Sequence, residues 1–339
     1  MSKVFFLKDF QKLGEATSKI LKDFYPKNSE IFVKIHFGEP GNKAAFTPKD
    51  IEPIISILSN LGSSVTLFDT PVAYTSPRST VTGYLKVAKD KGFGKLGKIL
   101  ISNEGIKIKT KDFTVKVAKP LVKAKNVLVI SHVKGHSCAG FGGAIKNLGM
   151  GGVTKESKAK IHDLSKPVLI KDCQGCGTCV RNCPAKALRL LNKISLATKK
   201  KIIISHQICW GCSICELVCP YHCLGPKKAF FDDLLAQGST AVINNLPKKT
   251  FYLNFLKNIV SNCDCETNPG KTLAPNIGVL FSENPLAIDK ASLDLINNIS
   301  GKNLFKEVHH KDPLLQINFA QKYTKWKSKY MLVKITHRE

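Results

Sequence analysis

Short apolar runs alternate with longer amphipathic stretches over the first 165 residues, a pattern typical of strands that alternate with helices. Strands are predicted at residues 4–7, 31–37, 64–68, 98–101 and 126–131, with a hairpin around 106–117. Helices are predicted at residues 9–24, 48–62 and 80–91, and Thr47 and Pro48 are suitable N-cap and first-turn residues for the second of them. The alternation predicts an α/β fold with mostly parallel sheet layers.

The same alternation returns after residue 225. A helix is predicted near 226–238, strands near 240–244, 250–255 and 277–281, and another helix at 285–299. Between the two halves, residues 167–222 form glycine- and proline-punctuated segments that hold eight of the 12 cysteines. We therefore divide the chain into a first α/β part (1–166), an inserted module (167–224), a continuation of the α/β domain (225–310) and a Lys-rich C-terminal tail (311–339), with the α/β parts forming one larger domain or two lobes.

The inserted module contains one cysteine motif twice. The first copy is Cys173-x2-Cys176-x2-Cys179-x3-Cys183-Pro184, and the second runs from Cys209 to Pro220 with the same spacing. This spacing is the bacterial ferredoxin run, in which the fourth cysteine of each copy ligates the other cluster. It predicts two [4Fe–4S] clusters. Cluster one takes Cys173, Cys176, Cys179 and Cys219, and cluster two takes Cys209, Cys212, Cys215 and Cys183.

Structural zinc is the alternative for these cysteines. Zinc sites usually use separated Cys-x2-Cys pairs with four ligands for each ion, whereas here three cysteines crowd into seven residues, twice. The spacing favours clusters over zinc. Two neighbouring clusters in one small module favour electron transfer over a purely structural role.

A second group of candidate residues follows the strand at 126–131. His132, Lys134 and His136 alternate along the chain and would share one face of an extended strand. A glycine-dense stretch comes next, with candidate cofactor-binding residues Gly140, Gly142, Gly143, Lys146 and Asn147. Glycines let the backbone approach a ligand and form an anion-binding nest. Because α/β folds bind ligands after their strands, we expect a site for an anionic substrate or cofactor here, with a tight structural crossover as the alternative.

Four cysteines lie outside the two runs: Cys138, Cys223, Cys263 and Cys265. Cys263 and Cys265 form a Cys-x-Cys pair that could hold a metal or line the same site. Cys138 lies next to His136, and His36 ends a strand at a Gly-Glu-Pro-Gly turn and could join the pocket. A lone cysteine is more often a small buried hydrophobic residue, so these assignments rank below the cluster cysteines.

Composition narrows the classes of protein. No apolar run approaches the roughly 18 residues that a membrane span needs, and the N-terminus does not resemble a secretory signal, so we expect a cytoplasmic protein without a membrane span. In that compartment, 12 cysteines favour metal binding over a disulfide framework. The net charge of +27 suits acidic partners, but only four of the 52 basic residues are arginines, which does not favour a dedicated nucleic-acid reader.

These segments together resemble a known family. The chain is similar to the uncharacterised iron–sulfur-centre proteins, a domain-of-unknown-function family whose members often carry a ferredoxin insert. The resemblance rests on the two cysteine runs and on VKIHFGEPGN (33–42), SHVKGHSCAGFGGAIKNLGMG (131–151), NCDC (262–265) and IGVLFSENPLAIDKASLDLI (277–296). AGFGGAIKNLGMG also resembles a glycine- and lysine-containing stretch of lactate-racemase-like proteins, which implies a two-lobed α/β fold with a cleft.

The favoured hypothesis is an iron–sulfur oxidoreductase. Electrons would pass through both clusters to a substrate or an organic cofactor such as a flavin, held near His132, Lys134, His136, Lys146 and Asn147. The lysines would hold anionic groups and a histidine would move the accompanying proton. An acidic ferredoxin or flavodoxin would be the redox partner. The alternatives are an electron carrier with no chemistry of its own and a nucleic-acid-binding iron–sulfur protein.

Overall fold

The computed structural model describes residues 1–191 and 201–336, and its centre is one eight-stranded sheet. The strand order is β18-β1-β17-β14-β7-β2-β3-β4, and β17 is the strand that runs antiparallel to both neighbours. The strands are β1 (Ser2–Leu7), β2 (Glu30–Lys34), β3 (Ser64–Asp69), β4 (Lys98–Ile101), β7 (Asn126–His132), β14 (Lys249–Leu256), β17 (Gly278–Ser282) and β18 (Tyr330–Lys334). The α/β fold with a largely parallel sheet is confirmed, on one continuous sheet rather than two lobes.

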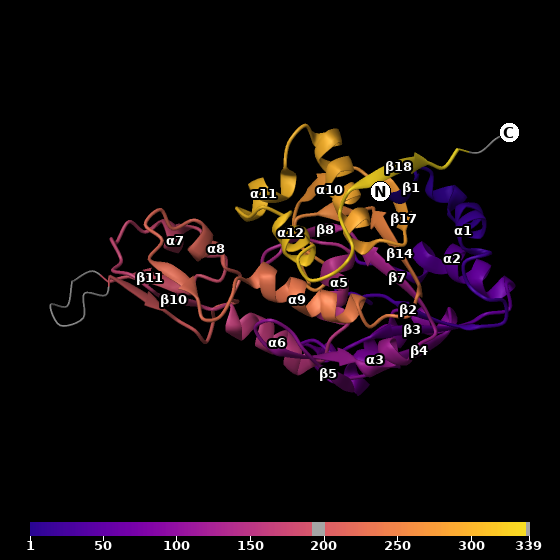
Figure 1. Cartoon of the computed structure of the whole chain (residues 1–339), viewed down its shortest axis with the longest axis horizontal. Coiled ribbons are helices and arrows are strands. Elements are labelled where there is room, and N and C mark those ends of the chain that lie inside the picture. The colour runs from indigo at the N-terminus through magenta and orange to yellow at the C-terminus, as the bar shows by residue number, and fades with distance from the viewer. Residues whose placement is uncertain (192–200, 337–339) are drawn as a thin grey trace.

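Helices cover both faces of this sheet (Figure 1). Their bounds are α1 (Leu13–Leu21), α2 (Pro48–Asn60), α3 (Val81–Asp90), α4 (Lys119–Lys123), α5 (Ala144–Gly151), α6 (Lys155–Leu164), α9 (Phe231–Ile243), α10 (Pro285–Ser300), α11 (Leu304–His309) and α12 (Leu315–Ala320). Val127 and Val129 of β7 pack into the core under α5, α9 and α10, while Leu128 and Ile130 pack under α1, α2 and α3. A strand buried on both faces explains why the apolar runs are continuous rather than alternating.

Short hairpins border the main sheet. They are β5 (Gly105–Lys109) with β6 (Thr114–Ala118), β8 (Lys134–His136) with β9 (Gly140–Gly142), and β15 (Ile259–Val260) with β16 (Thr272–Ala274). The first of them corresponds to the hairpin predicted around 106–117. Thr47 is the N-cap of α2 and Pro48 lies in its first turn, as predicted, and the structure adds a capping box between Thr47 and Asp50.

The cysteine-rich module lies at one end of the molecule (Figure 1). It contains β10 (Pro167–Leu169), α7 (Thr178–Arg181), β11 (Leu188–Leu190), β12 (Ile202–Ile204), α8 (Ile214–Leu217) and β13 (Leu224–Pro226). The chain leaves the main sheet after β7 and returns to it at β14, which pairs with β7 in parallel. The module therefore occupies the crossover between two adjacent strands, which an open α/β sheet accommodates outside its layers.

The strand predicted at 240–244 is wrong. These residues form the end of α9, which begins at Phe231 rather than near residue 226. Every residue of α9 is buried, and its contacts with α5 and α12 are extensive. Tertiary burial overrides the strand preference of its β-branched Thr240, Val242 and Ile243.

The segment after residue 310 is part of the α/β domain rather than a separate tail. β18 extends the main sheet by pairing in parallel with β1. Lys311 is fully buried and forms an ion pair with the equally buried Asp232. Its ammonium group also donates to the carbonyl oxygens of Cys138 and Cys212. One lysine thus joins α9, the β8–β9 turn and the second cysteine run.

Within the described residues, no helix combines the length and the apolarity that crossing a bilayer requires.

The Lys311→Met substitution should destabilise the protein strongly. It leaves the Asp232 carboxylate buried without a counter-charge, which typically costs about 3–5 kcal/mol. Thermal unfolding followed by circular dichroism under anaerobic conditions measures the loss. The exposed Lys306→Met serves as the matched control and should change little. The double variant Lys311→Met/Asp232→Leu should recover part of the loss, because it leaves no unpaired charge; equal midpoints for wild type and Lys311→Met would contradict the assignment.

Candidate functional site

Two adjoining cavities open at the carboxyl ends of β2, β3 and β7. Their empty volumes are about 490 and 560 Å³, and they share a wall made by His36, Lys146, Met150, Gly151 and Cys265. The carboxyl edge of an open α/β sheet is the usual ligand position of such folds, since the strand ends and the loops that follow them converge there.

Lys146 of α5 projects into both cavities. Burial lowers the pKa of its ammonium group to about 8, although Cys138 and Asp264 oppose the shift. The Nζ atom lies 3.4 Å from Sγ of Cys263 and 3.9 Å from Sγ of Cys265. A lysine in this position can hold an anion or stabilise a thiolate.

His132 and Lys134 both bind one buried carboxylate, that of Asp264. His132 donates through Nδ1 to Asp264 (2.9 Å) and through Nε2 to the carbonyl oxygen of Lys257 (2.6 Å). Lys134 donates to Asp264 and to the carbonyl oxygen of Ala44. Burial would raise the pKa of Asp264, but His132 and Lys134 hold it far below its usual range. In this structure the partners of Lys134 are protein groups, and its role in holding an anionic ligand stays a prediction.

His136 turns away from that ion cluster and lines the second cavity. Its Nδ1 accepts hydrogen bonds from the backbone N–H groups of Cys138 and Ala139, both at 3.1 Å. Burial and the nearby cations lower its pKa well below the usual value, so the ring is neutral. One donor atom each from His136, Cys263 and Cys265 lies within 4.8 Å of the others. Judged by the spacing of their donor atoms alone, these three residues are a candidate group for a metal.

Cys263 and Cys265 are joined by a disulfide in the wall of the first cavity. The sequence placed this pair in the candidate site, and the structure brings it beside Lys146 from a distant part of the chain. Cys138 is buried at the β8–β9 turn, where burial raises the pKa of its thiol.

The glycine-dense stretch contributes less to the cavities than its sequence suggests. Gly142 and Gly143 line the first cavity, whereas Gly140 packs against Pro313. Asp289 accepts hydrogen bonds from the N–H groups of Ala144 (2.7 Å) and Ile145 (2.9 Å). The first amides of α5 are thus occupied by a protein carboxylate instead of an external anion.

Asn147 has a positioning role. Its amide donates to the carbonyl oxygen of Ile130 and to Ser131, and its oxygen accepts from Lys34 at 2.6 Å. Lys34 in turn forms a fully buried ion pair with Asp69 at 3.0 Å. These contacts fix α5 against the ends of β2, β3 and β7. They also fix the position of Lys146, which precedes Asn147 in α5 and lines the cavity.

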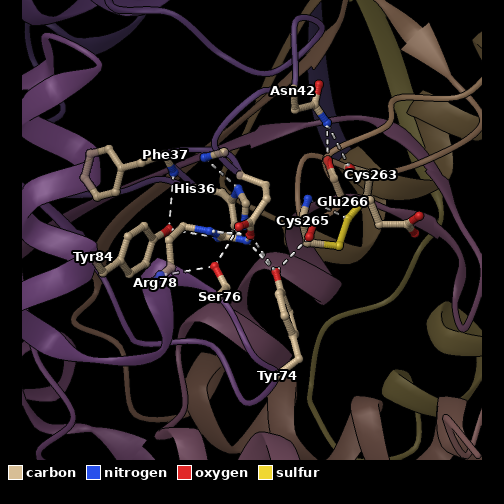
Figure 2. Close-up of polar contacts among 12 residues, drawn as sticks. His36, Phe37, Asn42, Tyr74, Ser76, Arg78, Tyr84, Cys263, Cys265 and Glu266 are labelled. Atoms are coloured by element: carbon tan, nitrogen blue, oxygen red, sulfur yellow. Dashed lines mark hydrogen bonds and ion pairs between the residues drawn. A yellow bond between two sulfur atoms is a disulfide. The ribbon is translucent and has the colours of Figure 1, made fainter. Parts of the chain in front are cut away.

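Several residues of the site carried no readable signal in the sequence. Arg78 is fully buried and forms an ion pair with Glu39, while Ser76 also donates to Glu39 at 2.6 Å. Figure 2 shows Arg78 lying among His36, Tyr74, Ser76 and Tyr84, next to the Cys263–Cys265 segment. Glu39 lies in the turn that follows His36, and that turn was the one sequence feature that pointed to this region. Arg78 lies 39 positions further along the chain, so only the folded chain shows that it pairs with Glu39.

The cysteines of the predicted cluster two share one cavity. Cys183, Cys209, Cys212 and Cys215 line a space of about 310 Å³, together with Trp210 and the proline that follows Cys183. The fourth cysteine of the first run therefore lies with the first three of the second run. A set of four converging thiols fits an iron–sulfur cluster, which thiolates ligate.

The cysteines of the predicted cluster one also lie together. Burial raises the pKa of Cys179 to about 11, and the thiols of Cys173, Cys219 and Cys176 act on it in the same direction. Cys176 is exposed, whereas Cys179 and Cys219 are buried. This set thus faces solvent on one side.

The two runs repeat each other in backbone geometry. Positive φ angles occur two residues after the first cysteine of each run (Gly175, 74°; Gly211, 62°), and again two residues later, at Gly177 and Ser213. In both runs the first cysteine accepts a hydrogen bond from the backbone N–H of the residue two positions later. Gly175 donates to Cys173 Sγ at 3.4 Å, and Gly211 donates to Cys209 Sγ at 3.4 Å. Such N–H donors stabilise thiolate charge and tune a bound cluster.

The second run is docked against the wall of the cavities. His162 lines the second cavity and donates from Nδ1 to the carbonyl oxygen of Trp210 at 2.7 Å. Ser165 donates to the carbonyl oxygen of Gly211 at 2.6 Å. Cys212 is linked to the β8–β9 turn through Lys311. The predicted cluster two is therefore the one adjacent to the candidate site.

The comparisons with known proteins give the family. The model described as "Domain of unknown function (DUF362)" matches residues 31–294. The chain belongs to this family. The match spans the cavity residues from His36 to Cys265, and the family description assigns no activity. No curated protein matches the chain.

Two solved structures are similar to parts of the fold. A crystal structure of a protein from Thermotoga maritima is 9% identical, with a TM-score of 0.46, and covers 87% of this chain and 59% of its own. The lactate racemase apoprotein from Thermoanaerobacterium thermosaccharolyticum is 11% identical, with a TM-score of 0.34, and covers 77% of this chain and 51% of its own. The chain thus spans about half to three fifths of the length of these two proteins.

Asp264→Asn should destabilise the site and the whole fold. An amide cannot neutralise Lys134 and His132, and removing one member of a buried ion cluster typically costs about 3–5 kcal/mol. Urea denaturation under anaerobic conditions measures the free energy of unfolding. Asp23→Asn, at an exposed position, is the matched control. If both variants were as stable as the wild type, the ion cluster would not support the site.

Proposed function

We propose that this protein is an iron–sulfur oxidoreductase that passes single electrons through two [4Fe–4S] clusters to a molecule bound beside Lys146. The observation that carries the proposal is the docking of the second cysteine run on the wall of that cavity. His162 contacts this run with one ring nitrogen and lines the cavity as well. A position beside the cavity is expected for a module that delivers electrons to a bound molecule, whereas a purely structural module could lie anywhere on the surface.

The cysteines present fit the two clusters. Cluster one would be held by Cys173, Cys176, Cys179 and Cys219, and cluster two by Cys209, Cys212, Cys215 and Cys183. Bound clusters would supply one-electron transfer steps. The backbone contributes N–H groups toward the sulfurs, as at Ala187, whose N–H donates to Cys183 Sγ at 3.2 Å. The exposed Cys176 makes cluster one the outer end of the path.

The cavity residues favour an anionic molecule as the electron acceptor. Lys146 lies in both cavities without a carboxylate partner of its own within the described contacts, unlike Lys34 and Lys134. The neutral His136 nearby can take part in hydrogen bonding as the acceptor gains a proton. The acceptor would be a substrate or an organic cofactor.

The surface of the module suits an acidic redox partner of the ferredoxin or flavodoxin type. Six of the 12 exposed large apolar side chains among the described residues lie on it: Ile170, Leu190, Ile208, Trp210, Leu217 and Tyr221. Apolar groups in a strongly basic chain provide contact area together with long-range attraction for an acidic protein.

Native mass spectrometry of anaerobically purified protein tests the proposal. The expected mass is that of the polypeptide plus two [4Fe–4S] units, with an additional small anionic molecule in the cavity. Two clusters and no further mass would favour an electron carrier without chemistry of its own. Two zinc ions in place of iron would contradict the proposal.

Replacing one crossed ligand tests the assignment of the clusters. Cys219→Ser should lower the iron content from about eight to about four atoms per chain, because each cluster holds four irons. Electron paramagnetic resonance of the reduced variant should then show one isolated cluster. Cys223→Ser, next to the module core but outside the ligand sets, is the matched control and should keep both clusters. Full iron content in Cys219→Ser would show that the ligand sets are assigned incorrectly.

A further inference from the structure

The disulfide between Cys263 and Cys265 is held in the cavity wall by contacts that do not involve sulfur. Tyr74 donates to the carbonyl oxygen of Cys265 at 2.8 Å, and Asn42 donates to that of Glu266 at 2.7 Å. These contacts and the disulfide appear together in Figure 2. The N–H of Glu39 donates to the carbonyl oxygen of Asp264 at 2.7 Å. The segment therefore has an anchor for its backbone whether the sulfur–sulfur bond is closed or open.

The surroundings of this pair suit a dithiol as well as a disulfide. Lys146 lies within 3.9 Å of both sulfurs, and a neighbouring ammonium group stabilises a thiolate. The N–H of Cys265 donates to the sulfur of Cys263 at 3.1 Å. Both cysteines line the first cavity, so a molecule bound there would meet the sulfurs directly.

The hydrogen bonds of His136 argue against a metal at this position. Its Nδ1 accepts two backbone N–H groups, so in the neutral ring the other nitrogen carries the proton. No lone pair of the imidazole is then free for a metal. One ring nitrogen of His136 lies within 4.8 Å of both sulfurs, so the imidazole is a direct neighbour of the pair. A proton-bearing imidazole and an ammonium group beside a sulfur pair are suited to reduction of that pair.

The predicted cluster two is adjacent to this arrangement. His136 and His162 both line the second cavity, which Cys265 also lines. His162 contacts the backbone of the second cysteine run, and Lys311 links Cys212 to the β8–β9 turn that follows His136. A short series of packed groups thus connects the cysteines of cluster two with the disulfide.

We infer that Cys263 and Cys265 form a two-electron relay between cluster two and the molecule bound in the cavity. The inference rests on the proposed function, because the clusters must deliver the electrons. Two clusters that each carry one electron match a disulfide, which is a two-electron couple. In the first step the sulfur–sulfur bond breaks, and two electrons from the reduced clusters and two protons from solvent convert the pair to two thiols. In the second step the sulfur–sulfur bond re-forms, and the two electrons and two protons pass to the bound molecule, which is reduced. A reduced ferredoxin-type protein is the external donor that restores the clusters.

Peptide mapping after reduction tests the relay. Holoprotein is mixed anaerobically with an excess of chemically reduced ferredoxin, which is too large to reach the cavity, and is then quenched in acid and alkylated with N-ethylmaleimide under denaturing conditions. Trypsin releases residues 258–271 (NIVSNCDCETNPGK), a peptide whose only cysteines are the two in question. The peptide should carry no label before reduction and two labels after it.

Counting electrons provides the second measurement. Wild-type holoprotein should take up about four electrons per chain, two for the clusters and two for the disulfide. Cys263→Ser should take up about two and keep the resonance signals of both reduced clusters. Cys138→Ser, a buried cysteine outside the pair, is the matched control and should keep about four.

The results separate failure of the relay from failure of the proposed function. If the protein contains both clusters and they are reduced, but peptide 258–271 remains unlabelled, the relay is overturned and the electron path stands. Two labels before reduction, or an uptake of about two electrons by the wild type, also overturn it. A protein that carries zinc in place of iron fails as an electron-transfer protein, and the cluster-fed relay is overturned with it.

Discussion

The buried carboxylate of Asp264 holds the candidate site together. It accepts from His132 at the end of β7 and from Lys134 at the start of β8, while its own backbone is bound by Glu39 in the loop after β2. Three segments that are far apart in the sequence thus meet at this one residue. A buried carboxylate needs counter-charges. If the segment that carries the cysteine pair moved away from β7, Asp264 would lose its partners, and His132 and Lys134 would be left in apolar surroundings without a carboxylate.

That constraint also determines how the rest of the site is arranged. With Cys263 and Cys265 fixed beside β7, α5 presents Lys146 to them from the other side of the cavity. Asn147 and Lys34 set the position of α5 relative to the strand ends. The cysteine module belongs to the crossover that leaves β7 and returns at β14, so it emerges from the same edge of the sheet as the cavity. The adjacency of the second cysteine run and the cavity follows from this topology.

Local signals predicted many of the elements. Thr47, Pro48 and Asp50 supply the cap of α2, and the run at 98–101 matches β4, because both features depend on neighbours in the sequence. The strand predicted at 240–244 was wrong because β-branched residues prefer strands when tertiary contacts are ignored. Here these residues lie on α9, a helix that is buried on all sides. The edge strand β18 had no signal, since a Lys-rich segment becomes a strand only where β1 offers its free edge.

The order of residues along the chain was enough to predict three features: an α/β fold, a duplicated cysteine run whose spacing suits two clusters, and a group of candidate site residues from His132 to Asn147. These features depend on spacing along a few residues, which the chain carries locally. Which of these residues lie together depends on the folded chain. It joined Asp264 to Lys134, so that Lys146 is the one of the two predicted lysines that faces the cavities, and it buried Arg78 against Glu39 beside the cysteine pair. Such partners lie tens to more than a hundred positions apart, and the free energy that selects them comes from burying charge in pairs, which only the assembled core requires.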